Sequence, residues 1–125
     1  MVKITLKQLK EAIKKSWDRD TCHFKFIWDN NSLSDSAGHC RAVALIVNDY
    51  FGGEIIYAHV VGNPKWDHYW NKLPSGKEID LTKDQFPKNV IFTKSKIISR
   101  KNTLSSKRTQ KGYKILMKRV RSLLK

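Results

Sequence analysis

Near the start of the chain, apolar residues recur every three or four positions, which is the spacing of one face of an α-helix. These apolar residues are Leu6, Leu9, Ile13 and Trp17. Just before them, Thr5 and Gln8 have the spacing of a capping box, in which two side chains bond backbone N–H groups that the helix leaves unpaired. The pattern predicts an amphipathic helix that runs to about Trp17.

A second helical segment follows a polar stretch, residues 18–36, which we expect to form a long, partly packed loop. From Cys40 to Phe51 apolar residues occupy nearly all sides, as in a helix that is buried all round. Gly52 and Gly53 then supply the permissive backbone that ends a helix. A strand is the alternative because valine and isoleucine favour strands, but the length and the two glycines favour a central, buried helix.

Three strands are expected after this helix. Residues 54–61 are rich in β-branched and aromatic side chains, and residues 68–73 follow a Gly-Asn-Pro loop. Residues 74–77, Pro-Ser-Gly-Lys, are typical of a turn, after which residues 78–82 favour the next strand. The simplest assembly is a meandering antiparallel sheet packed on the helix that begins at Cys40.

The last predicted helix covers about residues 105–124. Its apolar stripe consists of Tyr113, Leu116, Met117, Val120 and Leu124. Its other faces carry seven cationic side chains: Lys107, Arg108, Lys111, Lys114, Lys118, Arg119 and Arg121. Such a helix usually packs its stripe on its own domain and keeps its charges in water, although the same charges are suited to binding a phosphate backbone.

The positive charge of the chain is concentrated in its last third. The formal net charge is +14, and all eleven acidic residues lie at or before Asp84. From Gln85 onwards no carboxylate side chain remains, whereas before that point acids and bases nearly cancel. This asymmetry points to an anionic partner: a nucleic acid bound without sequence specificity, a phosphorylated ligand or an acidic protein. No zinc-finger spacing or glycine-rich phosphate loop accompanies it.

The composition indicates one globular domain. The chain is 40% hydrophobic and 29% charged, which is ordinary for a folded protein. The longest apolar run, residues 42–47, is too short to span a bilayer, and the first residues lack the apolar core of a signal peptide. We expect a cytoplasmic protein with reduced thiols, no membrane association and no cofactor. A disulfide between Cys22 and Cys40, or a metal site at the adjacent Cys-His pairs, is the less favoured interpretation.

Cys40 stands where the pattern predicts the first turn of the buried helix. The positive end of a helix favours thiolate over thiol, and an adjacent imidazolium favours it further, so such a cysteine can act as a nucleophile at neutral pH. The alternative is an inert cysteine that packs as a small hydrophobic residue.

His68 and Asp80 fall on the next two predicted strands, across a tight hairpin, where they can lie side by side. A carboxylate in that position holds the imidazole in one tautomer and stabilises its charged form. Taken singly, His68 is interpreted as a surface strand residue and Asp80 as the solvent-facing position of an alternating strand. Together with Cys40 they suit covalent acyl transfer.

Four blocks of sequence carry a family resemblance. They are residues 38–55 (GHCRAVALIVNDYFGGEI), 68–71 (HYWN), 73–82 (LPSGKEIDLT) and 84–86 (DQF). Together they resemble the bacterial YunG-like family, and the opening residues 9–17 are also similar. The resemblance therefore runs from about Leu9 to Phe86, and its most specific parts are the Phe-Gly-Gly-Glu and Ile-Asp-Leu-Thr blocks at their mutual spacing.

The order Cys, His, Asp in that family is similar to the order in papain-like and transglutaminase-like folds. The resemblance implies an α+β fold with a papain-like, cysteine-protease-type core, in which N-terminal and central helices pack on a small antiparallel sheet. It implies a nucleophile, a general base and an orienting residue, which are Cys40, His68 and Asp80. With the basic C-terminal helix added, the single domain, residues 1–125, divides into a core of about 5–86 and an extension of about 87–125.

One position departs from the family pattern. A glutamine usually precedes the cysteine, but here His39 occupies that place. If this side chain helps to form the oxyanion site, the replacement would alter or abolish activity. We expect His39, Trp70 and Asn71 to line the substrate cleft, with a core position as the alternative for Trp70.

Two functions follow from these expectations. The first is a thiol-dependent hydrolase or acyltransferase that acts on an amide, isopeptide or thioester bond through a cysteine acyl intermediate. The second is a non-catalytic interaction protein on the same scaffold, which binds a nucleic acid or an acidic protein through its basic C-terminal region.

Overall fold

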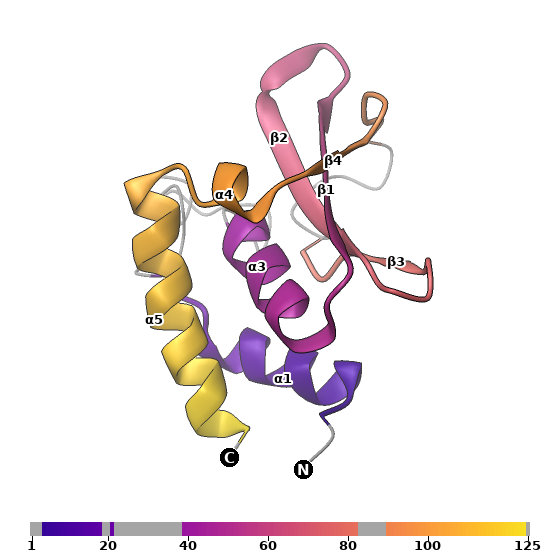
Figure 1. Cartoon of the computed structure of the whole chain (residues 1–125). Helices are drawn as coiled ribbons and strands as arrows, with labels where there is room; N and C mark the ends of the chain where they lie inside the picture. The colour runs from indigo at the N-terminus through magenta and orange to yellow at the C-terminus, as the bar shows by residue number, and fades with distance from the viewer. Residues whose placement is uncertain (1–3, 19–20, 22–38, 83–89, 125) are drawn as a thin grey trace.

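The computed structural model of the chain describes residues 4–18, 21, 39–82 and 90–124, with side chains at all of these positions except 63–66. Its elements are α1 (Leu6–Ser16), α3 (Cys40–Phe51), β1 (Glu54–Val60), β2 (Asn63–Lys72), β3 (Glu78–Ile79), β4 (Lys96–Ile98), α4 (Arg100–Thr103) and α5 (Lys107–Leu123). Figure 1 shows α3 at the centre, between the helices α1 and α5 and the sheet. The predicted α+β architecture, with helices packed on a small antiparallel sheet, is confirmed. The predicted loop, residues 18–36, lies mostly outside the described residues.

The first helix, α1, begins as its sequence predicts. The Gln8 backbone N–H donates to the Thr5 hydroxyl at 3.1 Å, and the Thr5 backbone N–H donates to the Gln8 side-chain oxygen at 2.9 Å. These reciprocal bonds are the predicted capping box. Leu9 and Ile13 are buried, and Trp17 leaves the helix with an extended backbone.

The central helix, α3, is buried along most of its length, which accounts for its apolar sequence. Within 40–47 only Arg41 is partly exposed. Two glycines with left-handed backbones end the helix, Gly52 at φ 74° and Gly53 at φ 84°. A Cβ atom at Gly53 would lie 2.1 Å from the Lys72 carbonyl oxygen, so only glycine fits where α3 meets the end of β2. The prediction of a helix here, rather than a strand, is confirmed.

The four strands form one antiparallel sheet in the order β3, β2, β1, β4. The first three make the predicted meander, in which Tyr57 of β1 pairs with Tyr69 of β2. The second strand is longer than predicted, because it begins at Asn63 directly after a turn in which Gly62 has a φ of 80°. His68 therefore lies within the strand and does not open it.

The edges of the sheet also differ from expectation. The strand β3 is only two residues long, so Asp80 lies just after it rather than inside it. The strand β4 pairs with β1, and the short helix α4 follows it. Neither of these two elements is predicted, because three or four residues are too few to show a periodic pattern.

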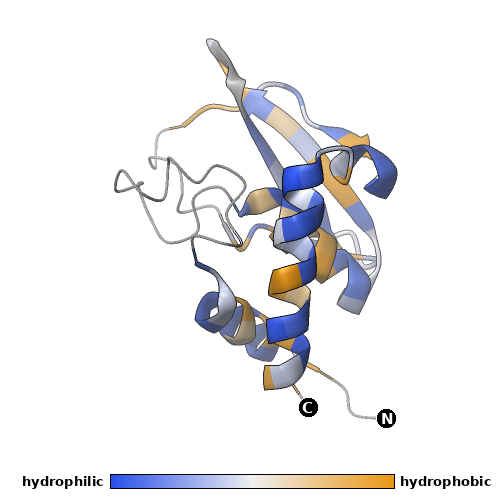
Figure 2. Cartoon of the chain, turned by 90° about the vertical axis from the view of Figure 1, so that its left-hand side faces the viewer, coloured by the Kyte–Doolittle hydropathy of each residue, from blue (hydrophilic) through white to orange (hydrophobic). Residues whose placement is uncertain are grey.

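The C-terminal helix, α5, completes the core. Its Leu116 and Val120 are fully buried and pack in one cluster with Leu9 and Ile13 of α1 and with residues of α3. The predicted helix and its apolar stripe are confirmed, with Lys107 as the first helical residue. In Figure 2, α5 faces the viewer, and much of its outer surface is hydrophilic. No helix in the described part of the chain combines the length and apolar character needed to cross a membrane.

Candidate active site

Cys40 is the first residue of α3, at the end of the helix that carries partial positive charge. The preceding residue, His39, is the N-cap, and its side chain does not bond the backbone of the first turn. Cys40 is a free thiol that is 8% exposed, so it is largely buried but retains accessible surface. Cys22, the other member of the disulfide considered above, lies outside the described residues. The helix thus presents a reduced sulfur at its positive end.

His68 and Asp80 form a short ion pair next to this helix. The His68 Nε2 atom donates to Asp80 Oδ2 at 2.6 Å, and the His68 side chain has no exposed surface. Asp80 is held in turn by Thr82, whose backbone N–H and hydroxyl donate to its other oxygen, Oδ1, at 3.2 and 3.4 Å. The turn that follows β3 therefore fixes the carboxylate, so the short length of β3 does not prevent Asp80 from reaching His68.

Two aromatic rings cover the His68 imidazole. Trp70, two residues along the same strand, stacks on it with 5.7 Å between ring centroids, and Phe92 stacks at 5.5 Å. Phe92 reaches the site because its backbone bridges Val60 of β1. The sequence pattern gives no sign of this contact, because Phe92 belongs to a segment without periodicity.

The charge state of His68 follows from its neighbours. Burial alone would lower the pKa of His68, but hydrogen bonds with Asp80 and with Cys40, and the negative charges of both partners, raise it to about 9. The ring is therefore an imidazolium at neutral pH. The Cys40 side chain is thus a second hydrogen-bond partner of the ring, beside Asp80. The structure thus brings together the three residues that the sequence singled out.

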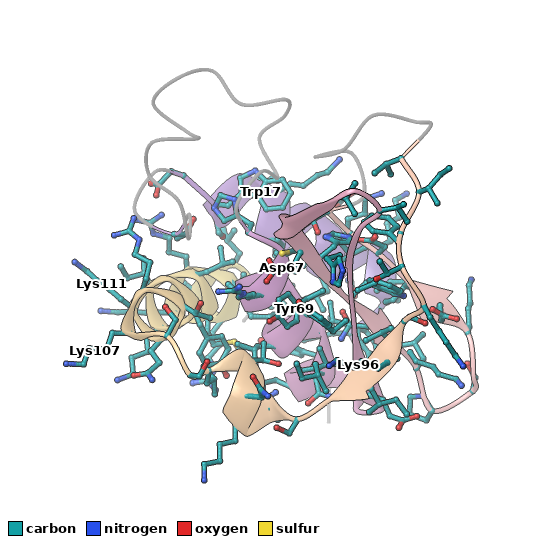
Figure 3. All side chains as sticks on the ribbon, turned by 90° about the horizontal axis from the view of Figure 1, so that it is seen from above. Trp17, Asp67, Tyr69, Lys96, Lys107 and Lys111 are labelled. Atoms are coloured by element: carbon teal, nitrogen blue, oxygen red, sulfur yellow. The ribbon has the colours of Figure 1, made fainter. Side chains whose placement is uncertain are left out.

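A second charged pair lies beside the cysteine. Arg41 follows Cys40 in α3 and makes a 3.0 Å ion pair with Asp67 of β2, while its guanidinium lies 5.1 Å from the centroid of the Tyr69 ring. Burial would lower the pKa of Arg41, but the charge of Asp67 and those of Tyr69 and Cys40 raise it. Figure 3 shows Asp67 and Tyr69 near each other above α3. Sequence reasoning missed this pair, although Arg41 is adjacent to the cysteine and Asp67 to the histidine.

The three residues expected to line a substrate cleft have different surroundings. His39 is fully buried, and its Nε2 lies 2.6 Å from the Thr21 hydroxyl and 3.2 Å from the Asp18 carbonyl oxygen. Asn71 is buried and donates to the Ala44 carbonyl oxygen at 2.9 Å. Trp70 is half-buried and stacks on His68, as described above. Of the three, Trp70 contacts the catalytic candidates, and the cleft itself stays a prediction.

The seven basic residues of the C-terminal helix do not share one environment. Arg119 donates to the Ser16 carbonyl oxygen at 2.8 Å and to Asp18 Oδ2 at 2.9 Å, and so joins α5 to the end of α1. Arg108 is half-buried. The other five, all exposed, are Lys107, Lys111, Lys114, Lys118 and Arg121. In Figure 3, Lys107 and Lys111 project from α5 away from the sheet.

The fold and these contacts define a class of α+β protein in which a cysteine at the start of a central helix meets a histidine–aspartate pair on an antiparallel sheet. Comparison with known proteins then gives the family. The model of the YunG protein family matches residues 5–125. The chain therefore belongs to the YunG family.

A curated relative agrees with this assignment. The "Uncharacterized protein YunG" of Bacillus subtilis (strain 168) is 32% identical over 81 residues, which are 65% of this chain and 63% of the relative. The chain thus matches less than two thirds of that relative's length. No solved structure matches the chain. The predicted family is confirmed, and the family match extends beyond Phe86 to include α5.

Proposed function

We propose that this protein is a thiol-dependent hydrolase or acyltransferase that acts on an amide, isopeptide or thioester bond through an acyl intermediate on Cys40. The observation that supports the proposal is the hydrogen-bonded series of Cys40, His68 and Asp80 at the first turn of α3. A nucleophile, a base and a group that orients the base are the components of covalent acyl transfer. A papain-like or transglutaminase-like arrangement of the core is part of this proposal.

In the proposed reaction, His68 already holds the proton as an imidazolium, and the Cys40 thiolate attacks the carbonyl carbon of the substrate. The tetrahedral oxyanion collapses to a thioester on Cys40, while His68 donates its proton to the leaving amine or thiol. Water or an acceptor amine then attacks the thioester with His68 as general base, which releases the acid or amide and restores the thiolate. Hydrolysis and transfer differ only in the acceptor.

Asp80 and the two stacked rings support His68 in this scheme. The carboxylate fixes the orientation of the ring and stabilises the imidazolium, which is the state before attack and again after the thioester is released. Trp70 and Phe92 stack on the ring, which is fully buried, and a hydrogen bond in such surroundings is stronger than in water.

The oxyanion is assigned to the backbone at the start of α3. His39 stands where the family usually has glutamine, and its ring is occupied with Thr21 and Asp18. The N–H groups of the first turn have no bond from the His39 side chain, and the helix end carries partial positive charge. In this proposal these N–H groups stabilise the oxyanion, a role that the glutamine side chain would have where the family carries glutamine at this position.

Alkylation of Cys40 by iodoacetamide tests the proposal, because only the thiolate reacts. We expect rapid labelling that persists to about pH 6, where an ordinary thiol is less than about 1% ionised. His68→Ala should slow labelling at that pH by at least about tenfold, and Cys40→Ser should abolish it. Mass spectrometry of the Cys40 peptide separates this reaction from that of Cys22.

A matched control is the other described histidine of the sheet, His59 on β1, whose ring lies edge-on to that of Tyr57. His59→Ala should label like the wild type. If the wild-type protein follows the pH profile of an ordinary thiol, and His68→Ala leaves that profile unchanged, the enzyme proposal is wrong. If labelling of the wild type instead persists to about pH 6 and depends on His68, an acyl group transferred to Cys40 from a small activated ester, detected as added mass, would demonstrate the first half-reaction.

A non-catalytic interaction protein is the second candidate function. The five exposed cations of α5 favour it, because they lie apart from the candidate site and are available to an anionic partner. If Cys40 proved unreactive, binding of an anionic partner would be the remaining candidate function.

A further inference from the structure

Five exposed cations form a single row along α5. Their separations are four, three, four and three residues, which at about 100° per residue places them within an arc of about 80° on one side of the helix. The row spans about 21 Å at about 1.5 Å per residue. Its members, which we call the α5 row, are Lys107, Lys111, Lys114, Lys118 and Arg121. Four of the five buried residues of the helix, Thr109, Gly112, Leu116 and Val120, lie on the opposite side, and Met117 lies between the two.

The α5 row is electrostatically unfavourable for the helix that carries it. Each member has another cation three or four residues away, and like charges at these separations destabilise a helix. The first turn of α5 contains Lys107 and Arg108 but no acidic residue, although the N-terminal end of a helix favours negative charge. Lysine and arginine favour a helix by their propensity, as glutamine and glutamate also do, but the repeated positive charge opposes the helix.

Within the described part of the chain, no acidic side chain forms a salt bridge with any of the five. The described ion pairs employ other cations, including Arg119 of the same helix, which bonds Asp18. Three of the five members, Lys114, Lys118 and Arg121, also border an open hollow of about 440 Å³, whose other lining residues are Tyr113, Met117 and Ser122. The row thus combines charge with a concave surface.

The shape of the row distinguishes between polyanions. A helix that inserts into a membrane surface needs an unburied apolar face. Here Leu116, Met117 and Val120 are buried in the core of the protein, so that face is already occupied. A nucleic acid offers a regular line of phosphates, about one charge per 1.7 Å of duplex, which a straight row of cations can follow. We propose that the α5 row binds the sugar–phosphate backbone of a nucleic acid, without reading its sequence.

The test measures binding of a fluorescein-labelled duplex DNA of about 20 base pairs by fluorescence anisotropy across a salt series. Five phosphate contacts give a slope of log K against log salt of about −4.5, so that affinity falls about 500-fold between about 50 and 200 mM salt. Replacing three lysines by glutamine, in Lys111→Gln/Lys114→Gln/Lys118→Gln, should reduce the slope by about 2.7. Glutamine has nearly the helix propensity of lysine, and circular dichroism checks the fold.

The first helix supplies a matched control. Lys7, Lys10 and Lys14 are exposed on α1 with the same three-and-four spacing, so their triple replacement by glutamine removes the same charge. This control should keep the wild-type slope. Equal losses in both triple variants would show that net charge alone attracts DNA, and would overturn the proposal.

Two other probes separate the remaining polyanions. If vesicles of phosphatidylserine and phosphatidylcholine, or a polyglutamate chain, bind more tightly than the duplex at the same salt and depend on the α5 row, then the row serves a membrane or an acidic protein and the proposal is wrong. The measurement does not involve Cys40, so failure of the proposed enzyme function leaves its outcome unaffected.

Discussion

The imidazole of His68 is fully buried yet protonated at neutral pH, because its bonded neighbours outweigh the effect of burial. Asp80 bonds one ring nitrogen, and the rings of Trp70 and Phe92 stack against the imidazole and contact each other. The charge of this histidine is therefore a property of its partners. Removing the carboxylate would leave burial as the larger influence.

Asp80→Asn keeps the shape of the side chain and removes its charge, so the pKa of His68 should move well below 9. The measurement is the pH titration of the His68 ring by NMR, with the ring of His59 in the same spectra as a reference. An unchanged midpoint in the variant would mean that Asp80 does not hold the proton on His68.

The same shift makes stability depend on pH. Folding raises the pKa of His68 from 6.5 to about 9, so the stabilisation that it contributes is complete below pH 6.5 and is lost as the pH rises through 9. The loss amounts to at most about 3 kcal/mol. Urea unfolding across this range should show the free energy of unfolding falling in the wild type. His68→Gln, which cannot titrate, should show a flatter profile, and an equally steep one would assign the loss to another group.

Arg41 and Asp67 should act on Cys40 in opposite directions. The Arg41 charge favours the nearby thiolate, and Asp67, 3.0 Å from Arg41, offsets that charge. We expect Arg41→Gln to slow iodoacetamide labelling at about pH 7 by about threefold or more, and Asp67→Asn to accelerate it. Rates that change in the same direction in both variants would indicate a packing effect in place of an electrostatic one.

Among the elements, the junction of α3 and β2 shows how backbone geometry fixes the site. Gly53 has a positive φ and faces the Lys72 carbonyl oxygen at a distance that excludes a Cβ atom. The junction holds the end of the central helix against the strand that carries His68. Its geometry therefore sets the angle at which helix and strand meet.

Gly53→Ala should lower the free energy of unfolding by about 2 kcal/mol or more, because it adds a clash to the cost of a left-handed backbone. Gly76 is the control, since its φ is 92° but nothing lies within 4 Å of the position of its Cβ atom. Gly76→Ala should cost only about 1 kcal/mol. If urea unfolding shows equal losses of free energy in the two variants, the backbone at Lys72 must shift to make room for the added methyl group.

The elements predicted from sequence are those with a repeated local signal. The capping box of α1, the apolar run and glycine stop of α3 and the amphipathic stripe of α5 all depend on residues within a few positions of one another. By contrast, β4 and α4 are too short for a period, and the length of β2 depends on one turn glycine. Tertiary pairing decides such elements, and a single sequence does not encode it locally.

For the candidate site, residue type and order predicted the meeting of Cys40, His68 and Asp80, although Asp80 reaches His68 from a turn. The contacts of Phe92 and of the Arg41–Asp67 pair were beyond prediction, since each joins elements that are distant in sequence. The same holds for Thr21, whose bond with His39 crosses the polar segment between α1 and α3.

The whole molecule carries a net charge of +14, with the excess in its last third. Part of that excess is the α5 row, whose members repel one another within a single helix. The positive charges of the row destabilise the helix but favour binding of a polyanion. A substitution in the row that raises stability should therefore weaken polyanion binding.

Lys111→Glu should raise the free energy of unfolding by about 1 kcal/mol at low salt, because it converts repulsion with Lys107 and Lys114 into attraction. Lys111→Gln should give about half that gain, and both gains should shrink at high salt. Urea unfolding measures the effect, and the anisotropy assay should show weaker DNA binding in both variants. If the free energy of unfolding does not rise at low salt, repulsion within the row does not destabilise α5.

The contacts of α5 also bear on when Cys40 can become reactive during synthesis. Arg119 bonds the end of α1, and Gly112 packs so closely on Thr21 that a Cβ atom would lie 2.7 Å from its carbonyl oxygen, while Thr21 holds His39, the neighbour of the nucleophile. The ribosome makes α1 before α5. A nascent chain released only as far as β4 would carry the cysteine, the histidine and the aspartate without the helix that supports them, so a reactive sulfur should appear only once α5 has emerged from the exit tunnel.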